Sequence, residues 1–217
     1  LNEEEKTRLR ELNTQLSMLQ LNFSQNLLHE TNNTFVVVES VEELAGLPEG
    51  NIAAAAKMAE EQGQPGKWMF NMQRPSCNPV LQYCENRELR EKVYSAYLMR
   101  GNNGGEHDNN DIIAEMVSLR YEKAKLLGYV SYAHYVISDE MATTPEAVYE
   151  LLNQVWDPAL ERAKQELERL KTLYRREKGN ANDFKSWDWW YYAEKVRQRD
   201  YQLEEASVRE YLSLERR

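Results

Sequence analysis

The sequence predicts an all-α fold, mainly long antiparallel helices, with a minor two-stranded β element near residues 34–38 and 67–72. Apolar residues recur at spacings of three and four over residues 3–30, which is the pattern of a long amphipathic helix. Short β-branched or alternating runs bounded by turn residues occur at only two places. From Ser76 onward the pattern is helical, with short turns and no repeat of fixed period. Uneven helices joined in this way indicate a helical assembly.

The first 72 residues contain one long helix, two short ones and both strands. A capping box formed by Ser40 and Glu43 predicts that a short helix begins there. Residues 49–63 are alanine-rich and end at Gly63, which is typical of a helix with a glycine stop. The two strands are expected to pair across this intervening helix. The apolar stripe of the first helix consists of Leu9, Leu12, Leu16, Leu19, Phe23 and Leu27.

The rest of the chain is predicted to form a series of helices and one long interrupted run. Thr144 is the expected N-cap of the long run, and Pro145 occupies its first helical position. Pro158 interrupts the apolar pattern, so the run to Gly179 is expected to split or kink there, with Asp157 as a new N-cap. The other helices are predicted at residues 79–86, 87–100, 112–126, 130–142, 186–201 and 204–217.

Length and charge limit the classes of function. A chain of 217 residues is enough for one large domain or two small ones. Its 27 basic and 36 acidic residues give a net charge of −9, which argues against nonspecific binding to nucleic acid or to an anionic membrane. The sequence has no run of 18 apolar residues and no signal-peptide core near its first residue.

The stretch "RGNNGGEHDNND", residues 100–111, is the strongest candidate for a ligand loop. A phosphate loop needs a preceding strand and a Lys-Ser or Lys-Thr after its glycines, whereas here a helix precedes and Glu106 follows. The acids also do not follow the order of a calcium loop. A helix-to-helix joint explains most of the stretch, with Gly101 as the stop and Asp108 or Asn109 as the next cap. The glycines Gly101–Gly105 exceed what one stop needs, so a substrate-facing role stays open.

No catalytic, cofactor-binding or metal residue is assigned from the sequence. "HETNN", which begins at His29, lacks the second histidine of HExxH and cannot place two ligands on one helical face. A zinc site assembled across the fold from His29, His107 and His134 is disfavoured by its ligand count. Cys77 and Cys84 lie seven apart, which is not a metal-ribbon spacing, and are interpreted as buried thiols. No Ser-His-Asp or Cys-His pattern and no nucleophile elbow occurs.

The run "WDWWYY" is dense in aromatic side chains. A helix that carries aromatics on several sides is expected to be buried against more than one neighbour. A base-stacking platform would need interleaved basic residues. Lys195, Arg197 and Arg199 lie close by in the sequence, but the net charge of −9 weakens that alternative.

Several segments, in order, resemble one family. They are "LREKVYSAYLMRGNNGGEHDNNDIIAEMVSLRYEKAKLLGY", "YAHYVISDEMATTPEAVYELLNQVWDPALERAKQELERL" and "WDWWYYAEKVRQRDYQLEE". Together they resemble the thimet oligopeptidase and peptidyl-dipeptidase family of zinc metallopeptidases, and within it the bacterial dipeptidyl carboxypeptidases. The resemblance implies a helical shell of two lobes around a channel. It also implies a zinc ion held by an HExxH helix and a later Glu, with the HExxH Glu as general base.

One departure from the family is plain, because residues 1–217 contain no HExxH. In the family this motif follows the "WDWWYY" segment. The resemblance therefore implies that residues 1–217 are an internal fragment, a single helical piece of the channel wall, that is inactive alone and binds no zinc. The parent enzyme would use zinc and remove C-terminal dipeptides from peptides.

The resemblance also sets expectations for partners and location. The expected partners are a peptide substrate and the remaining lobe of the same polypeptide, with self-association of the fragment through its exposed lobe face. Nucleic acid and membrane are not expected partners, and the parent is expected to be soluble, in the cytoplasm or periplasm. The alternative is a stand-alone helical protein-interaction module, with natural termini near Leu1 and Arg217 and no large exposed apolar patch.

Overall fold

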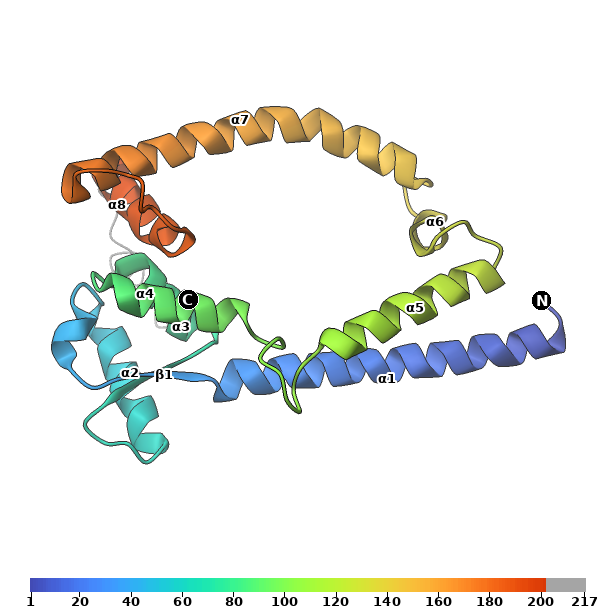
Figure 1. Ribbon diagram of the computed structural model, residues 1–217, viewed down its shortest axis with the longest axis horizontal. Coiled ribbons are helices and arrows are strands. Elements are labelled where there is room, and N and C mark those ends of the chain that lie inside the picture. Colours follow the sequence, from blue (N-terminus) through green and yellow to red (C-terminus); the bar gives the residue numbers. More distant parts are fainter. Residues whose placement is uncertain (202–217) are drawn as a thin grey trace, which may run out of the picture. The chain divides into compact units, whose positions relative to one another are not determined.

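The computed structural model describes residues 1–201 (Figure 1), and in that range it contains eight α-helices, two 3-10 helices and one two-stranded sheet. The predicted all-α class with a minor β element is confirmed. The predicted helix over 204–217 lies outside the described residues. The chain forms two compact units. Unit 1 comprises Leu1–Asn33 and Met99–Lys164, and unit 2 comprises Thr34–Leu98 and, of the described residues, 165–201.

Unit 1 is built from long helices. α1 (Glu3–Asn33) and α5 (Asn110–Leu126) run side by side (Figure 1), as the amphipathic pattern of the first helix requires. Leu12 of α1 and Leu119 of α5 are buried, and Arg8 donates two hydrogen bonds to Glu122 across the pair. The unit is completed by α6 (Tyr132–Ile137) and the first part of α7 (Pro145–Lys178), whose later residues belong to unit 2.

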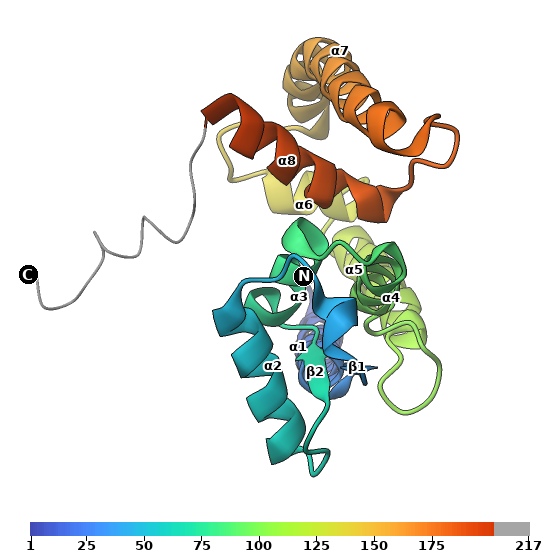
Figure 2. The same cartoon turned by 90° about the vertical axis from the view of Figure 1, so that its left-hand side faces the viewer.

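Unit 2 contains the sheet. β1 (Phe35–Val38) and β2 (Trp68–Asn71) pair antiparallel, with Val36 opposite Phe70, so both predicted strands and their pairing across a helix are confirmed. The short 3-10 helix η1 (Val41–Leu44) follows β1. The intervening helix α2 (Glu49–Glu61) lies beside β2 (Figure 2). The small residues Ala55 and Ala59 of α2 are buried, and small side chains allow such close packing.

Four more elements complete unit 2: α3 (Arg74–Tyr83), α4 (Arg87–Leu98), the 3-10 helix η2 (Ser186–Asp188) and α8 (Trp189–Tyr201). Cys77 and Cys84 are buried thiols within this core, as predicted. A second cluster joins α7 to α8 through Leu170, Tyr174 and Tyr192. The main core consists of Val38, Leu44, Leu47, Ala55, Phe70, Cys77, Val80, Leu81, Cys84, Leu89 and Val93.

Three predicted helix starts need correction. The Ser40 capping box is wrong, because the Ser40 hydroxyl bonds to Glu42 and the Glu43 backbone N–H donates to the Ser40 carbonyl oxygen at 3.3 Å. The helix predicted at 79–86 begins at Arg74, with a proline in its first turn where no backbone N–H is needed. The helix predicted at 130–142 is shorter and covers only Tyr132–Ile137.

The long run after Thr144 forms one helix. The Ala147 backbone N–H donates to the Thr144 hydroxyl at 3.3 Å, which confirms the predicted cap. The split at Asp157 is wrong, because α7 continues through Pro158 for 34 residues. A proline removes one backbone hydrogen bond, but the bonds on either side of it hold the helix. Residues 149–161 are exposed, so no packed neighbour opposes a local adjustment.

Candidate functional site

The glycine-rich loop follows α4 in the chain, leads into α5 and belongs to unit 1; its first glycine is Gly101. This residue has a φ of +74°, so it ends the helical segment in the left-handed conformation, as predicted. The Asn109 backbone N–H donates to the Gly101 carbonyl oxygen at 2.8 Å. A Cβ at Gly101 would lie 2.9 Å from Asn109 Nδ2, so the position has no room for a side chain. Both the conformation and the close approach therefore require glycine here.

The base of the loop is anchored to the last turns of α1. Glu30 Oε2 accepts hydrogen bonds from the Gly101 backbone N–H at 2.5 Å and from Asn103 Nδ2 at 2.8 Å. The buried Asn109 side chain accepts from Asn26 Nδ2 at 3.1 Å and donates to the Phe23 carbonyl oxygen at 3.2 Å. These contacts fix the two ends of the loop on one helix. The role of Glu30 was not predicted, since nothing near it in the sequence indicates contact with a distant loop.

The tip of the loop is open. Gly104 and Gly105 both have positive φ, at +72° and +87°, and a Cβ at either would meet nothing within 4 Å. Asp108 accepts from the backbone N–H groups of Asn110 and Gly104, both at 2.8 Å, and these bonds hold the pKa of Asp108 below its ordinary value. Asp108 therefore caps α5, whereas the Asn109 side chain does not. Without side chains, this tip allows another backbone to approach closely. The negative charge of Asp108 repels an anion.

The structure brings two of the three histidines together. The ring centroids of His29 and His107 are 3.7 Å apart, and His107 Nδ1 lies 3.4 Å from Asn26 Oδ1. His134 instead contacts Ser131, and its Nε2 atom lies 3.6 Å from Glu146. Among residues 1–201, no group of three or more His, Cys, Asp or Glu side chains is arranged to hold a metal ion. Within the described part of the chain, the two adjacent rings are not accompanied by the third ligand that a zinc site in a protein needs.

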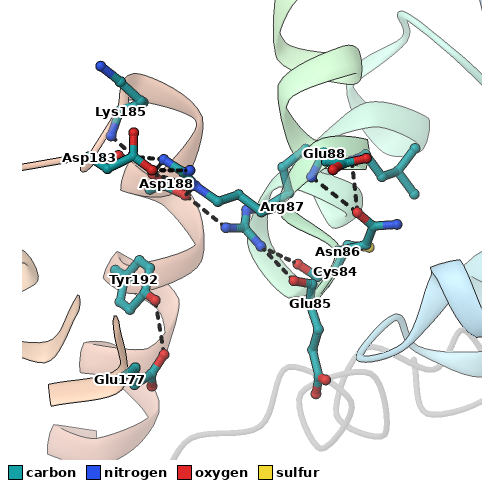
Figure 3. A network of polar contacts seen from close by, with 12 residues as sticks. Cys84, Glu85, Asn86, Arg87, Glu88, Glu177, Asp183, Lys185, Asp188 and Tyr192 are labelled. Carbon is teal, nitrogen blue, oxygen red and sulfur yellow. Dashed lines mark hydrogen bonds and ion pairs between the residues drawn. The ribbon is translucent and has the colours of Figure 1, made fainter. Parts of the chain in front are cut away.

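A second polar centre lies in unit 2, where α4 meets η2 (Figure 3). Asp188 is fully buried and accepts hydrogen bonds from Arg87 Nε at 3.0 Å and Arg87 Nη2 at 2.8 Å. Arg90 Nη2 donates to the same carboxylate at 2.8 Å, and the Lys185 backbone N–H donates at 3.0 Å. One carboxylate thus serves two guanidinium groups and the N-terminal turn that leads into α8.

The charges in this network are compensated. Burial alone would raise the pKa of Asp188, but the hydrogen bonds from Arg87, Lys185 and Arg90 outweigh burial and hold the pKa below its ordinary value. Arg87 also donates to the Asp183 carboxylate at 2.6 Å. Arg90 donates to the Cys84 carbonyl oxygen at 2.8 Å, and its guanidinium carbon lies 4.2 Å from the centroid of the Tyr191 ring. The network contains no nucleophile next to a base, so we interpret it as a structural contact between α4 and η2.

The aromatic run is only partly buried. Tyr192 is 1% exposed and packs near Tyr174 and Phe184, as predicted for a core helix. Its hydroxyl donates to Glu177 on α7 at 2.9 Å, and burial together with that bond raises the pKa of Tyr192. Trp190 is 44% exposed, so the expectation of burial on several sides does not extend to this residue. The role of Asp188 was not predicted, because its only signal in the sequence is a single acid within the aromatic run.

No helix in residues 1–201 is long and apolar enough to span a bilayer.

Comparison with known proteins gives a consistent result. Residues 80–217 match the sequence profile of peptidase family M3. Oligopeptidase A of Haemophilus influenzae is 37% identical over 215 residues, which is 97% of this chain and 31% of the relative. Dipeptidyl carboxypeptidase of Escherichia coli is 34% identical over 210 residues, again 97% and 31% of the two chains. A thimet-like oligopeptidase of Dictyostelium discoideum is 27% identical over 226 residues, or 99% and 32%. The chain spans about a third of the length of these relatives.

Proposed function

Because the chain belongs to peptidase family M3, we propose that it forms a non-catalytic scaffold of a zinc-dependent peptidyl-dipeptidase. In this proposal the whole enzyme removes C-terminal dipeptides from oligopeptides, and residues 1–217 contribute part of the wall of its substrate channel. One observation carries the proposal. The similarity covers 97% of the chain and joins it to a dipeptidyl carboxypeptidase about three times as long, while these 217 residues lack HExxH.

The zinc ion of the proposed enzyme would be held by residues outside this chain. Zinc in such an enzyme polarises the scissile carbonyl and activates water. The residues of this chain supply support instead. In unit 2, the buried joint of Arg87, Arg90 and Asp188 ties α4 to η2. In unit 1, Glu30 holds the base of the glycine loop so that its open tip can face a bound peptide.

Exposed apolar side chains on α7 favour the scaffold over a stand-alone interaction module. The stand-alone module is expected to have no large exposed apolar patch, whereas a piece of a larger fold exposes the face that packs against the rest of that fold. In α7, Trp156 is 62% exposed and Leu152 is 54% exposed, and several neighbours are similar. In the proposed enzyme this face packs against the rest of the polypeptide. The exposed side chains are Tyr149, Leu151, Leu152, Val155 and Trp156.

The proposal is tested by assaying the purified 217-residue chain for release of dipeptides from an N-blocked oligopeptide, with and without added zinc. A full-length dipeptidyl carboxypeptidase serves as the positive control. We expect no release by the chain under either condition, and calorimetry is expected to show no stoichiometric zinc binding at micromolar concentrations. Zinc-dependent release that a chelator abolishes would overturn the scaffold assignment.

The wall role needs a second test in a whole enzyme. The matching third of the Escherichia coli relative is replaced with these 217 residues, and dipeptide release is measured together with circular dichroism. Retained release supports the wall role. A chimaera that folds, binds zinc and releases no dipeptide would contradict it.

A further inference from the structure

Unit 1 carries a basic island on an acidic surface. Its described sequence holds nine basic and sixteen acidic side chains, a net charge of −7. Three of the nine bases lie on the C-terminal half of α5, next to tyrosines of α5 and of the segment that contains α6. We call this set the cation–tyrosine patch. It consists of Arg120, Lys123, Lys125, Tyr121, Tyr129, Tyr132 and Tyr135.

Each cation of the patch lies over a tyrosine ring. The Arg120 guanidinium carbon is 5.3 Å from the Tyr132 ring centroid, and Lys123 Nζ is 5.1 Å from that of Tyr135. Lys125 Nζ is 5.3 Å from the ring of Tyr121 on its own helix. Within residues 1–201, none of the three cations forms an ion pair with an acid. A cation over an aromatic face keeps hydrogen-bond donors that a carboxylate can use.

The one acid within the sequence segment of the patch already has a partner. Between Arg120 and Ile137 the only acid is Glu122, whose carboxylate accepts from Arg8 Nε at 2.7 Å. Glu146 of α7 lies 3.6 Å from the imidazole of His134. The α5 helix dipole accounts for a preference for lysine in its last turn, but it leaves the ammonium protons available. The patch therefore keeps a local positive charge within an acidic unit.

An apolar stripe leads into the patch. Ile113, Val117 and Tyr121 follow one another at intervals of four on α5, and they are 46%, 60% and 57% exposed. Lys125 continues the same line by one further turn. Tyr129 and Tyr132 both contact Tyr135, with ring centroids 5.4 and 5.8 Å apart. Exposed aromatic and aliphatic side chains beside unpaired cations are the composition of a surface that binds an anionic, partly apolar ligand.

We propose that the cation–tyrosine patch docks an acidic peptide segment. Carboxylates of the peptide pair with Arg120, Lys123 and Lys125, and its apolar side chains lie along the stripe from Ile113 to Tyr121. The acidic remainder of unit 1 repels such a peptide, so binding is confined to this face. The same acidic field disfavours nucleic acid, whose affinity depends on many phosphate contacts. The inference concerns binding only and does not depend on the proposed peptidase function.

The test measures fluorescence anisotropy of a labelled peptide that alternates Glu and Leu, titrated with the 217-residue chain. We expect saturable binding that weakens as salt rises from about 50 to 300 mM. A peptide with Lys in place of every Glu is expected not to bind. The double variant Lys123→Gln, Lys125→Gln is expected to weaken binding about tenfold, the change expected from two partly desolvated ion pairs.

Two controls keep the result interpretable. Lys92→Gln on α4 removes the same type of charge in unit 2 and is expected to leave the affinity unchanged. Tyr121→Ala keeps every charge of the patch and is expected to weaken binding severalfold through the lost apolar surface. Circular dichroism confirms that each variant is folded. Equal binding of the Lys peptide, or an affinity of the double variant within twofold of the original, would overturn the proposal.

Discussion

The two units of the chain bury their side chains to different extents. Unit 2 encloses a continuous apolar core and, beside it, a fully buried carboxylate with two arginines. Unit 1 buries few large residues, and its helices α5 and α7 expose long apolar stripes. A helix in a protein gains most of its stability from the packing of its apolar face. Unit 2 therefore holds its own helices in place, whereas unit 1 leaves the apolar faces of α5 and α7 exposed.

The same contrast holds for the polar contacts. In unit 2, Asp188 and Arg90 are paired away from water, where such contacts are strong but costly to disturb. In unit 1, the contacts of Glu30 and Asp108 fix a surface loop and leave its glycine tip open. The buried Asp188–Arg90 pair holds α4 and η2 in one position. The glycine tip of the loop in unit 1 stays exposed.

The largest effect is expected from Asp188→Ala. The change leaves the buried Arg90 without its carboxylate partner, and breaking a buried pair in this way costs about 3–5 kcal/mol. We expect the loss to appear in unit 2. Hydrogen exchange followed by mass spectrometry should show faster exchange in α3 and α4, with little change in α1 and α5.

Asp183→Ala is the matched control for this variant. Asp183 also pairs with Arg87, but its side chain is 61% exposed, so its loss is expected to cost less than about 1 kcal/mol. Equal effects of the two substitutions would show that burial does not decide the strength of this network.

A pair of leucine substitutions compares the two units directly. Leu44 is 1% exposed in the core of unit 2, whereas Leu152 is 54% exposed on α7. Leu44→Ala is expected to cost about 2–5 kcal/mol, because it leaves a cavity. Leu152→Ala is expected to change the free energy of unfolding by less than about 0.5 kcal/mol. Urea unfolding followed by circular dichroism measures both, and a large cost at Leu152 would mean that the α7 face is already covered.

Acid is expected to weaken unit 2 through Asp188. The pKa of Asp188 is lower in the folded chain than its ordinary value, so this group stabilises the fold above the unfolded-state pKa of about 4. That stabilisation is lost as the pH falls through the lower folded-state value. Asp188→Asn removes the titrating group, so its stability curve below about pH 4 should be flatter. Parallel acid curves for the two proteins would assign the acid sensitivity to other carboxylates.

The sequence predicted the class of fold because its signals were local. The stripe from Leu9 to Leu27, the β-branched run at 34–38 and the cap at Thr144 each depend on neighbours a few residues away. The errors also had local causes. Ser40 and Glu43 fit a capping pattern, but a 3-10 turn formed instead. Pro158 looked like a helix break, yet the hydrogen bonds on both sides of it hold α7 together.

The candidate site was harder to predict, since its contacts join distant residues. The sequence identified the glycine loop and the Gly101 stop, both of which are properties of consecutive residues. It could not show that Glu30 anchors the loop from 71 positions away. It also could not pair Asp188 with Arg87 across 101 positions. Long-range polar pairs leave no periodic trace in a single sequence, whereas apolar faces do.

The smallest expected effect is a difference in stability between alanine substitutions at two exposed glycines. A Cβ at Gly50 in α2 or at Gly104 in the loop would meet nothing within 4 Å, but only Gly104 has a positive φ, of +72°. Gly50→Ala should stabilise unit 2 by about 0.5–1 kcal/mol, because alanine favours a helix. Gly104→Ala should destabilise the loop by about 1 kcal/mol through backbone strain alone. Thermal unfolding is expected to show shifts of opposite sign.

The Gly104→Ala variant also tests the role of the loop tip when it is placed, together with Gly105→Ala, in a complete enzyme. If the tip faces the peptide, dipeptide release falls by more than the lost stability explains, because an added methyl group and a changed backbone alter the approach of the substrate. Gly50→Ala in the same enzyme is the control and is expected to leave release unchanged. Unchanged kinetics in the double loop variant would mean that the loop only connects α4 to α5 and does not face the substrate.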